Sequence, residues 1–78
     1  MKRSDIPDGH VLELAAAWLR APFEAPPVWD ALVAEGIPSK LALAKINHLS
    51  DRGLLDWGVS PRCAWPTVKG EQLLRELP

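Results

Sequence analysis

Apolar residues recur at helical spacing in four segments of the chain, and each segment is bounded by proline, glycine or a capping residue. In the first segment they repeat every three or four positions until Pro22, which predicts a helix over about 9–21. Asp8 stands directly before this repeat and is the expected N-cap. Residues 1–8 then form an N-terminal tail.

The next two predicted helices are separated by a tight turn. Pro27 occupies a first-turn position of a short helix, and Gly36 provides the left-handed residue that ends it. After a connector of a few residues, Ser39 is the expected cap of a longer helix, which ends before Gly53. Two helices joined by so short a connector predict a helix-turn-helix over 27–52.

Residues 54–66 differ from the rest because apolar stretches flank a turn-forming sequence there, which is typical of a β-hairpin. Trp57 and Trp65 are placed to face each other across it. Thr67 is the expected cap of a last helix over 67–77, whose leucines would fold back on the core.

The order of these elements is helix, helix, turn, helix, hairpin, helix. It predicts a mainly α fold with a small hairpin, a winged helix-turn-helix in which the hairpin is the wing. The chain has 78 residues, of which 47% are hydrophobic and 24% charged, which fits a single globular domain over 1–78.

Two stretches also carry a family resemblance. "INHLSDRGLLDWG" followed by "WPTVKGEQLL" resembles MarR-like and PadR-like winged-helix proteins, and "DWGVSPRCAWPTVKG" is similar to small winged-helix proteins of phages and prophages. The resemblance covers roughly residues 26–75 and implies the fold more strongly than a function. Pro66 departs from the usual Leu, and Arg62 is the single wing cation where DNA-binding wings are basic.

Charge and chemistry narrow the function further. The net charge is −1, but acidic residues dominate 4–36 and basic residues dominate 37–70. Two separated histidines and the one cysteine, Cys63, match no metal-site spacing, and one cysteine indicates a reducing compartment, so a cytoplasmic protein is expected. No apolar run is long enough to span a membrane. Nucleophile motifs and phosphate-binding glycine loops are absent, so we predict no enzyme and no cofactor.

The helix over 39–52 provides the candidate site. If Ile46 marks its inward direction, the 3.6-residue period turns Leu41, Lys45, His48 and Arg52 outward, flanked by Lys40, Ala44 and Asn47. Such a face offers cations for phosphates, polar groups for base edges and small apolar groups for a thymine methyl. The side chains predicted to contact nucleic acid are Lys40, Leu41, Ala44, Lys45, Asn47, His48, Arg52 and Arg62.

Two functions from different classes follow. In the first, the protein is a small regulator of transcription that binds double-stranded DNA through the helix over 39–52, and a dimer would strengthen its weak binding. In the second, it is a phage accessory or host-targeting module that binds a protein complex through Trp29, Asp30 and Leu41. Each feature also has a simpler interpretation: the cationic stripe as a solvated face, and the tryptophans as core residues.

Overall fold

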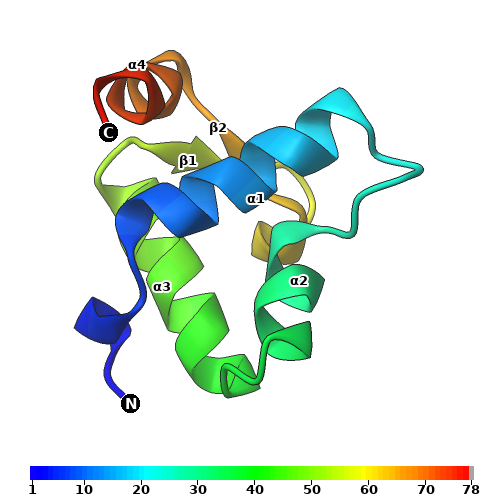
Figure 1. Cartoon of the computed structure of the whole chain (residues 1–78), viewed down its shortest axis with the longest axis vertical. Helices are drawn as coiled ribbons and strands as arrows, with labels where there is room; N and C mark the ends of the chain where they lie inside the picture. Colours follow the sequence, from blue (N-terminus) through cyan, green and yellow to red (C-terminus); the bar gives the residue numbers. More distant parts are fainter. Residues whose placement is uncertain (78) are drawn as a thin grey trace.

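The computed structural model describes residues 1–77, and over that part of the chain it contains four α-helices, two short strands and two 3₁₀ turns. The elements in chain order are η1 (Arg3–Asp5), α1 (Asp8–Arg20), α2 (Val28–Ala34), α3 (Ser39–Asp51), β1 (Leu55–Asp56), η2 (Pro61–Cys63), β2 (Trp65–Pro66) and α4 (Val68–Glu76). In Figure 1, α1 crosses the front of the molecule, with α2 and α3 below it and α4 above it. The predicted mainly helical fold with a small hairpin is confirmed.

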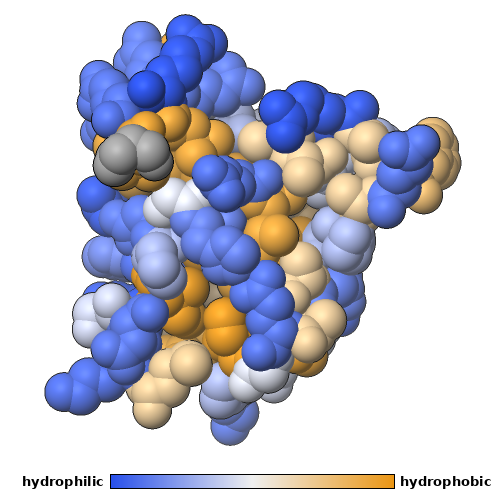
Figure 2. All heavy atoms as spheres, viewed as in Figure 1, coloured by the Kyte–Doolittle hydropathy of each residue, from blue (hydrophilic) through white to orange (hydrophobic). Residues whose placement is uncertain are grey.

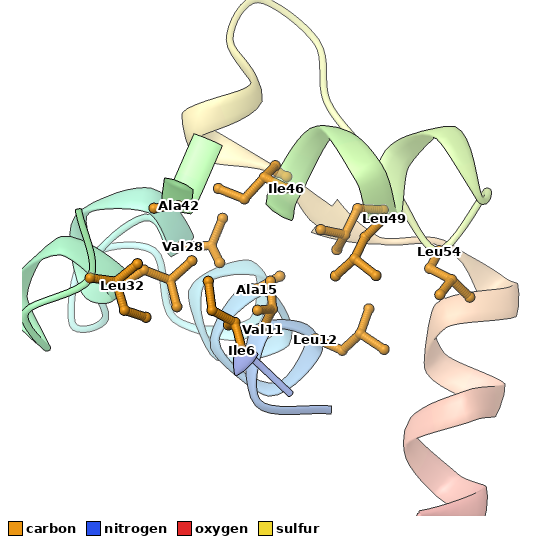
Figure 3. Packing of buried hydrophobic residues seen from close by; sticks show 13 residues of the cluster. Ile6, Val11, Leu12, Ala15, Val28, Leu32, Ala42, Ile46, Leu49 and Leu54 are labelled. Carbon is orange, nitrogen blue, oxygen red and sulfur yellow. The ribbon is translucent and has the colours of Figure 1, made fainter. Parts of the chain in front are cut away.

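The hydrophobic core lies between α1, α2 and α3, and the start of the hairpin closes it (Figure 3). Each helix contributes residues three or four positions apart, because such residues share one helical face. The buried core residues are Ile6, Val11, Leu12, Ala15, Val28, Leu32, Ile37, Ala42, Ile46, Leu49, Leu54, Leu55 and Ala64. The apolar spacing of the sequence therefore marks much of the core-facing side of α1 and α2, whereas the side predicted for α3 is corrected below.

The helix ends agree with the prediction within a few residues, but two of the predicted caps are wrong. Asp8 is the first residue of α1 and Ser39 the first residue of α3; the N-cap positions belong to Pro7 and Pro38, whose side chains make no capping hydrogen bond. A proline at this position fixes an extended entry into the helix. The Asp8 carboxylate is thereby left for other partners, described below.

Glycines end α2 and α3 as predicted. Gly36 has a φ of 94° and Gly53 a φ of 77°, values in the left-handed region that a side chain disfavours. The Gly36 turn sets α2 against the start of α3, and the Gly53 turn directs the chain from α3 into β1.

The hairpin is present, but its paired part is short. β1 and β2 are antiparallel, with Leu55 opposite Pro66 and Asp56 opposite Trp65. Trp57 follows β1 and has no tryptophan opposite it, so the predicted Trp57 and Trp65 pair is not formed. Pro66 ends the two-stranded ladder, in line with its missing backbone donor. The intervening loop, residues 57–64, includes η2, which packs against both α2 and α3.

A compact junction joins the hairpin to α4. The Thr67 hydroxyl caps the helix by accepting a hydrogen bond from the Gly70 amide at 3.1 Å, and it donates to the carbonyl oxygen of Gly53 at 2.6 Å. Gly70 lies so close to the hairpin that an added Cβ would be 2.1 Å from the Leu54 carbonyl oxygen. The Thr-Val-Lys-Gly sequence thus caps α4 and allows its first turn to touch the backbone before β1, and the predicted Thr67 cap is confirmed.

Candidate nucleic-acid interface

The orientation of α3 decides which of its side chains a ligand can reach. Its buried residues are Ala42, Lys45, Ile46 and Leu49. With about 100° between successive residues, the centre of this set lies about 50° away from Ile46. The exposed residues of the outward face are Lys40, Ala44, Asn47 and Asp51, and the centre of this set lies about 100° from the centre of the predicted stripe of Leu41, Lys45, His48 and Arg52.

This rotation reorders the predicted contact residues. Lys40, Ala44 and Asn47 were expected to flank the contact stripe and instead occupy the centre of the exposed face. His48 is half-buried at its edge. Leu41 is also half-buried and packs against the core, so only part of its side chain is available for the predicted contact with a thymine methyl or a protein partner.

Lys45 is the largest departure from the prediction. It is buried, and its Nζ donates to Asp8 Oδ1 at 2.5 Å. The sequence contained a signal for this, because Lys45 follows Ala42 by three positions and precedes Leu49 by four, the spacing of core residues. Lys45 therefore does not point outward from α3, and the predicted contact of Lys45 with a DNA phosphate on that outer surface is excluded.

Asp8, at the start of α1, contacts two cations: Lys45 within α3 and Arg52 at the C-cap position of α3. Its second oxygen, Oδ2, accepts from Arg52 Nη1 at 2.8 Å, so one carboxylate faces two cations. Burial acts to raise the pKa of the Asp8 carboxyl, but hydrogen bonds and charge attraction from Lys45 and Arg52 outweigh it, and the pKa lies below its usual value. Arg52 remains exposed, but part of its charge is already neutralised.

Arg62 is held beside the start of α3 by an aromatic ring. Its guanidinium carbon lies 3.8 Å from the centre of a Trp29 ring, and the indole Nε1 donates to the Ser39 carbonyl oxygen at 3.2 Å. The Asp30 carboxylate is 3.9 Å from the Arg62 guanidinium. Cation–π stacking holds Arg62 near Lys40, and both line a shallow hollow of about 230 Å³. The hairpin therefore places its one cation next to the exposed face.

The same contacts change the interpretation of Trp29. Its ring is half-buried, packs against the core and is covered on one side by Arg62. Trp29 is therefore half-buried, whereas an exposed anchor for a protein partner was predicted. Asp30 is exposed, as that prediction required, but it lies beside a cation of the same chain.

The N-terminal turn flanks α3 on the side away from the hairpin. η1 packs against α3, and Arg3 lines a hollow together with His48. Arg3 is not among the predicted contact residues, because residues 1–8 were predicted to form an N-terminal tail. Ile6 is buried in the core, and this apolar anchor was the signal that the segment before α1 is part of the fold.

Comparison with known proteins gives no relative from which a role could be transferred. No family model matches the chain, and no curated protein or solved structure matches it. Among residues 1–77 no cluster of histidine, cysteine and acidic side chains is arranged to hold a metal ion. Over the same residues, every helix is too short or too polar to cross a membrane.

Proposed function

We propose that this protein is a winged-helix DNA-binding protein, a small transcriptional regulator that inserts α3 into the major groove. The element order supports the winged-helix assignment: α2 and α3 are joined by a tight turn, a hairpin follows α3, and α4 returns to pack beside α1. In this arrangement α3 is the recognition helix, and residues 57–64 form the tip of the wing.

The observation that carries the proposal is the position of two exposed arginines on either side of α3. Arg62 stands on the hairpin side and Arg3 on the N-terminal side, while Lys40, Ala44 and Asn47 face outward between them. A major groove presents base edges between two phosphate backbones. An exposed helix with an amide at its centre and cations at both margins matches that order of groups.

The charge of this surface sets the expected strength of binding. Lys40, Arg62 and Arg3 are three exposed cations on this surface, with Arg62 3.9 Å from Asp30, whereas Lys45 is buried and Arg52 is paired with Asp8 at 2.8 Å. Since each phosphate contact contributes about 0.9 to the slope of log K against log salt, we expect a slope of about −3 for one copy. Such binding is weak, so a dimer on two half-sites remains our proposal for the functional form.

Fluorescence anisotropy with a labelled duplex, measured at several salt concentrations, tests this function. Lys40→Glu and Arg62→Glu should each weaken binding by about tenfold at low salt, since each removes one contact and adds a repulsive charge. Arg75→Glu is the matched control: it makes the same charge change on α4, and Arg75 lines a hollow between α4 and α1. Absence of binding at about 20 mM salt, or equal loss in all three variants, refutes the proposal.

One observation favours protein binding as a second candidate function. Phe23 is fully exposed in the loop between α1 and α2, and Val59 is fully exposed at the tip of the wing. In Figure 2 the loop between α1 and α2 projects from the right side of the molecule and ends in apolar spheres. An unsupported aromatic side chain is a common interface anchor. A partner held by the native protein and lost from Phe23→Ser, with DNA binding absent from both, would favour this function.

A further inference from the structure

A pocket of about 410 Å³ lies between η1 and α3, and donor-bearing side chains from both segments line it. Arg3 and Ser4 come from η1, and Lys45 and His48 come from one side of α3. The one acidic group in the lining is Asp8. Asp5, also in η1, does not line the pocket and accepts a hydrogen bond from the Lys2 amide at 2.8 Å.

The charges around this pocket do not balance. Asp8 is already shared, with Oδ1 on Lys45 and Oδ2 on Arg52, so one negative charge faces two positive ones. An ammonium group has three N–H donors, and Asp8 is the one side-chain acceptor that Lys45 Nζ contacts among residues 1–77. Because the Lys45 side chain is 5% exposed, water screens its charge poorly, and a nearby anion would be attracted more strongly than at an open surface.

We propose that this pocket binds one phosphate group, with Lys45 and Arg3 supplying the positive charge and Ser4 and His48 supplying further hydrogen bonds. The combination of a nearly enclosed ammonium and an exposed guanidinium is suited to an anion with several acceptor oxygens. Lys45, which does not contact a ligand from the outer face of α3, thus acts from its side.

The phosphate can come from either of two sources. Under the proposed function, on which this part of the inference rests, it is a phosphodiester of the DNA backbone on the N-terminal side of α3. A free phosphate ion or the phosphate of a small metabolite offers the same oxygens. One arm of the test contains no DNA, so phosphate binding to the pocket is measured independently of the proposed function.

In the first arm, inorganic phosphate is titrated into the ¹⁵N-labelled full chain, with sodium chloride at equal ionic strength as the reference. We expect phosphate-specific shifts of the amides of η1 and of those around Lys45. Arg3→Ala should weaken binding by about fivefold or more, since a charge-assisted contact is lost from an exposed side chain. Arg20→Ala, which removes an exposed arginine from the end of α1, should leave phosphate binding unchanged. Lys45→Met should abolish the shifts, and the same spectra report whether it is folded.

In the second arm, the salt dependence of duplex binding is compared for the native chain and Arg3→Ala. A slope reduced by about one identifies the phosphodiester as the source, and an unchanged slope with phosphate binding in the first arm identifies a free phosphate. If the native chain binds no DNA, the proposed function fails and the first arm alone decides the pocket. Phosphate shifts no larger than those with chloride, or unaffected by Arg3→Ala, overturn the inference.

Discussion

The contact between Asp8 and Lys45 predicts that replacing Asp8 lowers the free energy of unfolding much more than replacing Lys45 does. Asp8→Asn keeps the shape of the side chain but removes the negative charge, leaving the Lys45 ammonium enclosed opposite a neutral amide. Lys45→Met removes the enclosed charge itself and leaves Asp8 with Arg52 and water. A buried charge without a counter-charge is far more costly than the absence of the pair.

The exposed fractions of the side chains set the size of each effect. Lys45 is 5% exposed, Asp8 32% and Arg52 45%. Breaking a fully buried pair typically costs about 3 to 5 kcal/mol, and the partial exposure of Asp8 lets water reach the site, so we expect about 2 to 3 kcal/mol for Asp8→Asn. Lys45→Met should change the free energy of unfolding by less than about 1 kcal/mol. Against a total of about 4 to 12 kcal/mol for a domain of this size, the first loss is large.

Urea denaturation at neutral pH, followed by tryptophan fluorescence, measures both effects. Asp51→Asn is the control, because Asp51 is exposed at the end of α3 and forms no ion pair within residues 1–77. The double variant of Asp8→Asn and Lys45→Met should regain most of the stability that Asp8→Asn loses. The reasoning is refuted if Lys45→Met destabilises as much as Asp8→Asn, or if Asp8→Asn stays within about 0.5 kcal/mol of the native protein.

Three further predictions concern the same fold. Gly70→Ala should lower the free energy of unfolding by about 2 kcal/mol, because the added methyl group meets the Leu54 carbonyl oxygen. Gly9→Ala is the control, because its methyl group meets only the flexible end of a side chain and should be tolerated. Equal urea midpoints for the two variants would contradict this prediction. Thr67→Ala should cost about 1 to 2 kcal/mol, with Thr67→Ser retaining most of the stability. Since the folded pKa of Asp8 is lowered, its stabilisation is complete above the ordinary pKa of about 4 and is lost as the pH falls through the folded value. The stability gap between the native chain and Asp8→Asn should therefore narrow in acid.

Much of the fold was predictable because local signals agreed with the packing. Proline and glycine mark the ends of the helices, and the apolar spacing marks their buried sides. The positive φ angles at two turns favour glycine, and Gly36 and Gly53 occupy those positions. The start of α4 needs a side chain that accepts a hydrogen bond from a backbone amide, and Thr67 provides it. The hairpin was also recognisable from its sequence, although the length of its paired part was not.

The candidate site was less predictable because it depends on contacts between distant segments. A lysine at a core position is treated as outward-facing by any helical wheel that sorts residues by polarity, and that choice rotated the predicted face of α3. The correct orientation requires knowing that Asp8, far away in the sequence, reaches Lys45. The Arg62 and Trp29 stacking is equally non-local, since it depends on where the hairpin loop packs.

Under the proposed DNA-binding function, the charge order along the exposed face of α3 favours one orientation of this helix on DNA. Lys40 stands in the first turn, Asn47 in the middle and Asp51 at the last residue, so the face changes from positive to negative along the helix. Arg62 reinforces the positive end from the hairpin. A phosphate backbone is attracted to the first turn and repelled by the last, and the helix dipole acts in the same direction. Under the proposed function, the first turn of α3 should therefore lie closest to the phosphate backbone, with Lys40 rather than Arg52 as the phosphate contact of this helix.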